Sequence, residues 1–142
     1  MKQHQVDNDI LIPEMGILLK EGKEVRFTPT GVSMRPFIEG NSDTVILRQL
    51  PSVCVGDIIL AAVNANKYVL HRVIAIDADT ITLQGDGNLS GTEQCQSKNV
   101  LGTVVQIIRP NGKAKRITRG RLWYYLRPFR KLLLKIYRHL CV

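Results

Sequence analysis

Acidic residues are absent from the C-terminal part of this sequence. All 12 Asp and Glu residues lie before Arg109, together with only 9 of the 20 Lys and Arg residues. Residues 1–108 therefore carry a formal charge of −3, and residues 109–142 carry +11. The overall charge of +8 is typical of a protein that binds nucleic acid, but here it belongs to the C-terminal segment alone.

Cysteine pairs and long apolar runs are also lacking. Cys54, Cys95 and Cys141 have no C-x-x-C spacing, which indicates neither a disulfide framework nor a structural zinc site. No apolar stretch approaches the ~20 residues that cross a bilayer, and the polar, acidic residues 1–9 lack the pattern of a secretory signal. We therefore predict a cytoplasmic protein with free thiols and without a spanning segment, a metal or a cofactor.

The chain has the length and composition of one compact domain, with 142 residues of which 44% are hydrophobic. Residues 10–20 place apolar side chains at helical spacing before Gly22, which predicts a short helix. Six β-rich runs separated by turn residues follow, at 24–28, 44–48, 57–63, 68–76, 80–83 and 100–108. Residues 85–99 are polar and are predicted to form a long loop.

This pattern predicts a mainly β fold in two parts. Residues 1–108 form a small β domain with its core at 24–108, preceded by the short helix. Residues 109–142 form a basic linker and a tail, in which apolar residues at helical spacing predict an amphipathic helix over 121–140. Pro128 fits poorly inside a helix, so a kink or a new helix is expected there.

The most informative segment is Thr30-Gly31-Val32-Ser33-Met34-Arg35-Pro36-Phe37, between the first two predicted strands. Gly31 and Pro36 fix the local backbone direction and would present the Ser33 hydroxyl at a surface. By itself this is an ordinary turn serine. The pattern G-x-S-M-x-P, however, resembles the nucleophile motif of the signal peptidase I-like serine peptidases, a superfamily shared with LexA-type repressors.

Three further segments continue the resemblance in the expected order. Residues 55–59 resemble the family's Gly-Asp-Ile strand start, residues 68–74 its second catalytic strand, and residues 85–88 its Gly-Asp-x-Asn box. The resemblance covers about residues 25–108 and implies a signal-peptidase/LexA-like β domain. Residues 37–42 depart from it, because they separate by two residues a Gly-Asp pair that is usually adjacent in the family.

One residue decides which branch of the family the chain resembles. Bacterial-type signal peptidases and LexA-type repressors pair the serine with a lysine, whereas this chain has His71 before Arg72, as in the endoplasmic-reticulum and archaeal branch. Lys67 is a nearby lysine, but the predicted hairpin turn leaves it in solvent. An imidazole can accept a serine proton at neutral pH, where an ordinary lysine is protonated. The resemblance therefore implies Ser33 as nucleophile and His71 as general base.

A carboxylate is expected behind the histidine, where it would hold the tautomer and stabilise the imidazolium. Asp86 matches the aspartate of the family's Gly-Asp-x-Asn box, and the resemblance implies this role for it. The related branch has a further acidic residue several positions on, where this chain offers Thr92 and Glu93 in place of an aspartate.

These residues predict a serine endopeptidase that cleaves a leader or signal-like peptide bound as an extended strand. The oxyanion would bind the Ser33 amide, with Gly31 or the Thr30 hydroxyl as the second donor. The alternative is a binding module, a peptidase-like fold with an idle site whose function resides in the cationic tail. A LexA-type repressor is disfavoured, because the chain before Ser33 is too short for a DNA-binding domain and no matching lysine is present.

The tail of residues 109–142 has candidate partners of its own. A cationic, amphipathic helix with aromatic residues is typical of segments that lie on an anionic membrane surface. Nucleic acid is the second candidate, because phosphate attracts basic segments without regard to sequence. The wide apolar face at Leu132-Leu133-Leu134 favours the membrane, with packing on a protein as the third possibility. We expect a peptide or preprotein substrate and peripheral contact with the inner face of the membrane.

Overall fold

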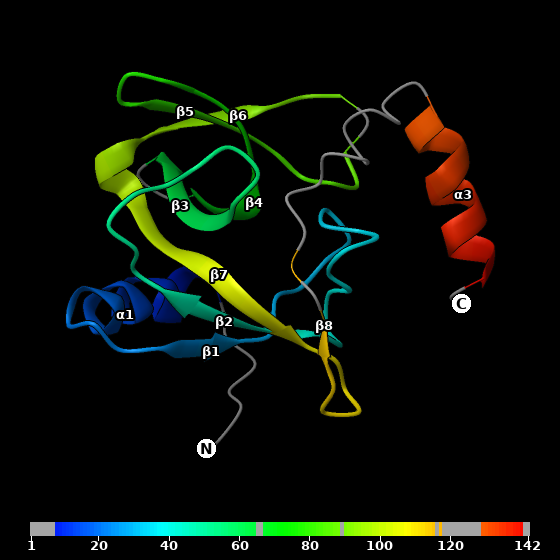
Figure 1. Cartoon of the computed structure of the whole chain (residues 1–142), viewed down its shortest axis with the longest axis horizontal. Coiled ribbons are helices and arrows are strands. Elements are labelled where there is room, and N and C mark those ends of the chain that lie inside the picture. Colours follow the sequence, from blue (N-terminus) through cyan, green and yellow to red (C-terminus); the bar gives the residue numbers. More distant parts are fainter. Residues whose placement is uncertain (1–7, 65–66, 89, 116, 118–128, 141–142) are drawn as a thin grey trace.

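A curled antiparallel sheet forms the body of the protein. The computed structural model describes residues 8–64, 67–88, 90–115, 117 and 129–140. Strands contain more of the described residues than helices do, and the sheet bends into a half-barrel, which confirms the predicted mainly β fold. Helix α1 (Asn8–Lys20) lies against the sheet, and a small C-terminal helix, α3 (Arg130–Leu140), stands apart from it (Figure 1).

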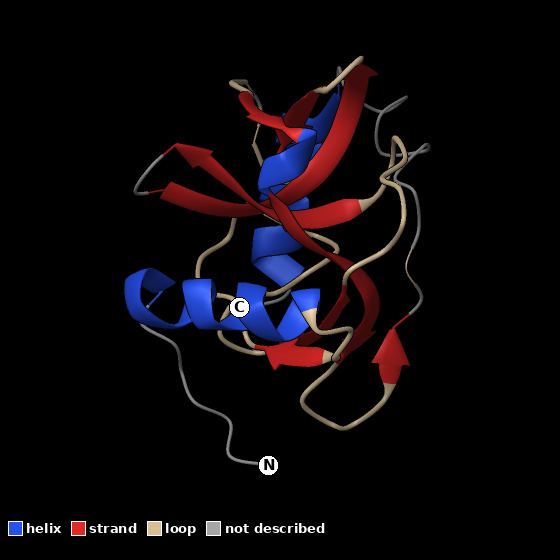
Figure 2. Cartoon of the chain, turned by 90° about the vertical axis from the view of Figure 1, so that its left-hand side faces the viewer, coloured by secondary structure: helices blue, strands red, loops and turns tan. Residues whose placement is uncertain are grey.

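Eight strands make up this sheet among the described residues. They are β1 (Val25–Phe27), β2 (Thr44–Arg48), β3 (Ile58–Asn64), β4 (Lys67–Asp77), β5 (Thr80–Gln84), β6 (Glu93–Gln96), β7 (Val100–Ile108) and β8 (Ala114–Lys115). The order across the sheet is β1-β2-β7-β3-β4-β5-β6, with β8 paired to β7, and all these pairings are antiparallel. Six of the strands match the predicted runs, and Figure 2 shows how strongly the sheet curls.

The predicted loop at residues 85–99 contains a strand that the sequence analysis missed. Its residues 93–96 form β6, which pairs with β5 so that Ile81 lies opposite Cys95 and Leu83 lies opposite Glu93. A short 3₁₀ helix, Ser97–Asn99, then leads into β7. The prediction of a loop throughout this segment was wrong, because backbone pairing with β5 holds a strand that contains a single apolar residue.

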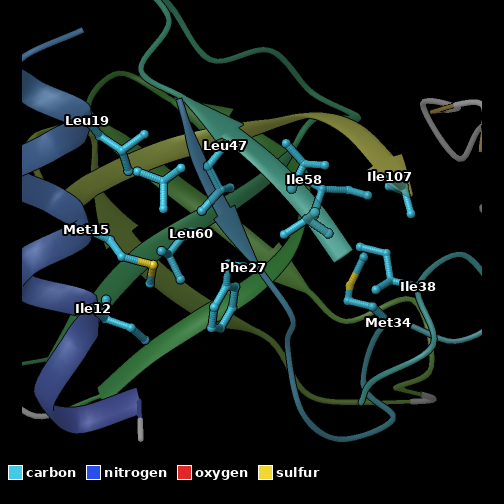
Figure 3. Packing of buried hydrophobic residues seen from close by; sticks show 13 residues of the cluster. Ile12, Met15, Leu19, Phe27, Met34, Ile38, Leu47, Ile58, Leu60 and Ile107 are labelled. Carbon is cyan, nitrogen blue, oxygen red and sulfur yellow. The ribbon is translucent and has the colours of Figure 1, made fainter. Parts of the chain in front are cut away.

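Helix α1 covers one face of the sheet. Its side chains Ile12, Met15 and Leu19 are spaced three and four residues apart, so they share one face of the helix and are all buried. They pack in a core cluster that includes Phe27 and Leu60 (Figure 3). The helix begins two residues before the predicted start at residue 10 and ends at Lys20, as predicted.

Strand β3 lies between two core clusters. Ile58 and Leu60 belong to the cluster beneath α1, whereas Ile59 and Ala61 belong to a second cluster with residues of β4, β5 and β6. Side chains alternate between the two faces of a strand, so β3 is buried on both sides. Its neighbour β4, which pairs with β3 along residues 67–72, is held rigidly by this arrangement.

The β domain extends beyond the predicted boundary at residue 108. Ala114 and Lys115 pair with the end of β7, and Ile117 packs against the cluster beneath α1. The predicted basic linker therefore begins as part of the sheet. Of the predicted tail helix, the structure describes α3, while Pro128, where a kink or helix start was predicted, lies outside the described residues.

Candidate active site

The loop between β1 and β2 carries Ser33 and is fixed by its own apolar residues. The amide of Arg35 donates to the Val32 carbonyl at 3.1 Å, and the amide of Ile38 donates to the Met34 carbonyl at 3.0 Å. Met34 and Ile38 are buried in the core cluster beneath α1. The loop is therefore anchored directly after a half-buried serine.

Ser33, His71 and Glu93 form a chain of polar contacts across three segments. His71 Nε2 lies 3.2 Å from Ser33 Oγ, and His71 Nδ1 lies 3.0 Å from Glu93 Oε2. The imidazole is 8% exposed and the carboxylate-bearing side chain 22% exposed. A hydroxyl, an imidazole and a carboxylate thus lie in series, an order similar to that of the triads of serine hydrolases.

The structure corrects the contact predicted for Asp86. Its carboxylate pairs with the Arg72 guanidinium, with Nε to Oδ1 at 2.9 Å and Nη2 to Oδ2 at 2.7 Å, and both side chains are almost fully buried. His71 and Arg72 are consecutive on β4, so their side chains leave the strand in opposite directions. Asp86 reaches the arginine, and the position behind the imidazole is held by Glu93.

The sequence carried two signals for Glu93, namely the further acidic residue of the related branch, which the resemblance placed at Thr92 or Glu93, and an alternation within this segment. Along β6, Cys95 is buried and Glu93 half-buried, whereas Gln94 and Gln96 are exposed. Glu93 and Cys95 therefore share the inner face of the strand. Four residues with one apolar position do not stand out in a polar segment, so only the pairing of β6 with β5 brings Glu93 to His71.

Arg72 joins the four motif segments to one another. Besides Asp86, its Nη1 donates to the Gly56 carbonyl at 2.8 Å, and its guanidinium lies 5.0 Å from the centre of the Phe37 ring. Asp57 beside Gly56 has a structural contact, because its Oδ2 accepts the Cys54 amide at 2.9 Å. Arg72 is thus a buried structural centre next to the site, and not a group that faces a substrate.

The Gly-Asp-x-Asn box lies directly against the backbone of Ser33. The amide of Gly87 donates to the Ser33 carbonyl at 2.8 Å. A Cβ atom at Gly85 would lie 2.4 Å from the Ser33 carbonyl oxygen, and one at Gly87 would lie 2.7 Å from that of Val32. Glycine is required at both positions because the two backbones approach so closely, and their contact fixes where Ser33 stands.

A small cavity opens beside Ser33 and His71. Its volume is about 140 Å³, and it lies between the β1 side of the sheet and the first half of β4. The residues around it are Ile12, Phe27, Pro29, Thr30, Gly31, Ser33, Met34, Ile38, Gly40, Leu60, Tyr68, Val69, Leu70 and His71. The predicted oxyanion donors Thr30 and Gly31 are at this cavity, and Lys67 is exposed at the start of β4, as predicted.

Lys115 was predicted to lie in the linker, but it contacts the loop that carries Ser33. Its Nζ donates to the Pro36 carbonyl at 3.2 Å and also to the Phe37 carbonyl. Burial lowers the pKa of this lysine, and the positive charge of Arg109 lowers that pKa further, while nearby carboxylates oppose the shift. β8 therefore supports the loop that carries Ser33 at Pro36 and Phe37.

The packing of β6, on which the position of Glu93 depends, can be tested through two thiols. Cys95 is buried, and desolvation raises its pKa, whereas Cys54 is exposed. In a Cys141→Ser background at pH 8, we expect iodoacetamide to modify Cys54 roughly tenfold or more faster than Cys95, because alkylation requires an accessible thiolate. Peptide mass spectrometry measures both alkylation rates. The urea-unfolded protein is the control, in which Cys54 and Cys95 should react at similar rates. Equal rates in the native protein would contradict a packed β6.

No protein-family model matches this chain, and neither does any curated protein sequence. No helix within the described ranges is long and apolar enough to cross a membrane. Within the same ranges, no three His, Cys, Asp or Glu side chains gather in a way that could hold a metal ion.

Proposed function

We propose that this protein is a serine endopeptidase of the signal peptidase I-like type. The observation that carries the proposal is the chain of contacts from the Ser33 hydroxyl through His71 to Glu93, at 3.2 and 3.0 Å. The three residues come from separate segments of the chain and meet at the wall of a cavity. Both ring nitrogens of this buried imidazole are engaged, one by a hydroxyl and the other by a carboxylate.

The geometry supports acyl transfer with His71 as the base. Nδ1–H donates to Glu93, which leaves Nε2 to accept the proton of Ser33 as its oxygen attacks the substrate carbonyl. The imidazolium then gives this proton to the leaving amine, and the C–N bond breaks to leave an acyl-serine. Water, deprotonated by the same nitrogen, releases the acid and restores the serine. The Ser33 amide, with Gly31 or Thr30, would stabilise the oxyanion.

The edges of the sheet beside the cavity suit an extended substrate. β4 pairs with β5 along residues 72–77, and its residues 67–71 pair with β3 on one side alone among the described strands. β1, across the cavity, pairs with β2 alone within the same part of the structure. A peptide could add between them as a strand and place one small side chain in the cavity. The proposed substrate is therefore an extended leader-like segment.

Covalent trapping of the serine tests this proposal. A fluorophosphonate, which phosphonylates activated serine hydroxyls by attack of the oxygen on phosphorus and loss of fluoride, is expected to label Ser33, and tandem mass spectrometry locates the adduct. The Ser33→Ala variant should lose the label, while Ser42, an exposed hydroxyl at the end of the same loop, should stay unmodified throughout. A folded wild-type protein that remains unlabelled would contradict the proposal and favour the idle binding module instead.

A further inference from the structure

Helix α3 is a described element that the proposed peptidase function does not use. Phe129 next to its start is 58% exposed, and Leu132 and Ile136 within it are 57% and 45% exposed. The three positions are spaced three and four residues apart, so their side chains form one strip along the helix. Figure 1 shows α3 set apart from the sheet.

Two exposed lysines accompany this strip on α3. Lys131 and Lys135 are exposed and, one helical turn apart, lie along one edge of the apolar strip, next to Leu132 and Ile136. No Asp or Glu follows Glu93 in the sequence, so no acidic side chain from this segment neutralises the lysines. An apolar strip beside an unbalanced positive charge is the result.

We propose that α3 binds an anionic lipid surface and lies in its plane. Phe129, Leu132 and Ile136 would enter the boundary between head groups and acyl chains, while the lysines contact the anionic head groups. The 11 residues of the helix span about 17 Å, well short of the ~30 Å hydrocarbon core. An orientation along the surface is therefore the one that satisfies both the apolar strip and the lysines.

Charge and apolarity together select this partner over two others. A nucleic-acid duplex would neutralise the lysines but would leave the strip of Phe129, Leu132 and Ile136 in water. A second copy of the chain could cover the strip, but it would bring the acid-free, +11 segments of two molecules together. An anionic bilayer offers negative charge and hydrocarbon in one surface, which matches both features of α3.

Vesicle sedimentation with the full chain tests the proposal. We expect binding to phosphatidylcholine vesicles containing 30% phosphatidylglycerol to exceed binding to pure phosphatidylcholine by roughly tenfold or more. Leu132→Gln with Ile136→Gln should lower the partition coefficient about tenfold or more, because the apolar contact is lost. Lys131→Gln with Lys135→Gln should lower binding to the anionic vesicles and weaken its salt dependence. Ile17→Gln, at an exposed position (60%) on α1, is the matched control and should bind like wild type.

Three results would overturn the proposal. The first is equal binding to anionic and neutral vesicles, or none to either. The second is vesicle binding that survives Leu132→Gln with Ile136→Gln, while a 20-base-pair DNA duplex binds more tightly than vesicles and depends on the lysines. The third is a dimer, seen by light scattering, that Ile136→Gln dissociates without any effect on vesicles. Ser33→Ala should bind vesicles normally, so this test is independent of the proposed peptidase activity.

Discussion

Ser33→Ala and His71→Ala are each expected to lower kcat/KM for a cleaved leader peptide by about 10⁴-fold or more. The hydroxyl supplies the electrons of the new bond, and the imidazole, 3.2 Å away, removes its proton, so loss of either member disables the same step. For the same reason the double variant should be no worse than either single variant. Hydrolysis is followed by mass spectrometry of the two product peptides.

Two further variants show whether the loss belongs to the triad. Ser42→Ala removes an exposed hydroxyl of the same loop and should retain wild-type activity. Glu93→Gln keeps the size of the side chain but removes the charge that stabilises the imidazolium, and kcat should fall about 10²- to 10⁴-fold with little change in KM. Full activity in Ser33→Ala would exclude the mechanism, and full activity in Glu93→Gln would exclude the third member of the triad.

Asp86→Asn is expected to destabilise the fold, which separates its role from that of Glu93. The Arg72–Asp86 pair is about 95% buried on both sides, and the charged hydrogen bonds between them are 2.7 to 3.2 Å long. Removing the carboxylate charge leaves a guanidinium without its counter-charge in a site of low dielectric. The expected loss is about 3–5 kcal/mol in the free energy of unfolding, a large share of the stability of a small domain.

Urea unfolding followed by far-ultraviolet circular dichroism measures this loss. Glu24→Gln is the matched control, because it breaks the Arg48–Glu24 pair, whose side chains are about half exposed, and should cost less than about 1 kcal/mol. If the Asp86→Asn protein is fully unfolded, the loss in the free energy of unfolding exceeds the stability of the domain, which also agrees with the prediction. A loss in stability below about 1 kcal/mol together with a loss of kcat like that of Glu93→Gln would instead place Asp86 in the catalytic machinery.

Local patterns were sufficient to predict most of the scaffold. The alternating and β-rich runs predicted six strands within a few residues, and the helical spacing of apolar residues over 10–20 predicted α1, because each element is defined by neighbours in the chain. The order of the motifs also predicted that Ser33 and His71 act together, and their side chains do meet, although 38 residues separate them.

The carboxylate that lies next to His71 could not be identified from the sequence in the same way. Matching by motif chose Asp86, since it lies in a recognisable Gly-Asp-x-Asn box, but the fold uses that carboxylate to neutralise buried Arg72. Glu93 reaches His71 because β6 pairs with β5 in one particular register, opposite Leu83. The same is true of Lys115, whose contact with the nucleophile loop depends on the pairing of β8 with β7.

The acid-free C-terminal segment also has some features that the sequence determined and others that only the tertiary structure decided. Its charge of +11 and its helical spacing of apolar residues follow from the sequence alone, because they depend only on composition and local order. That its first part belongs to the sheet, and that the strip of Phe129, Leu132 and Ile136 stays exposed on α3, was decided by tertiary structure. Long-range pairing determines which surfaces are covered and which carboxylate faces which base, and no local pattern in the chain encodes those partners.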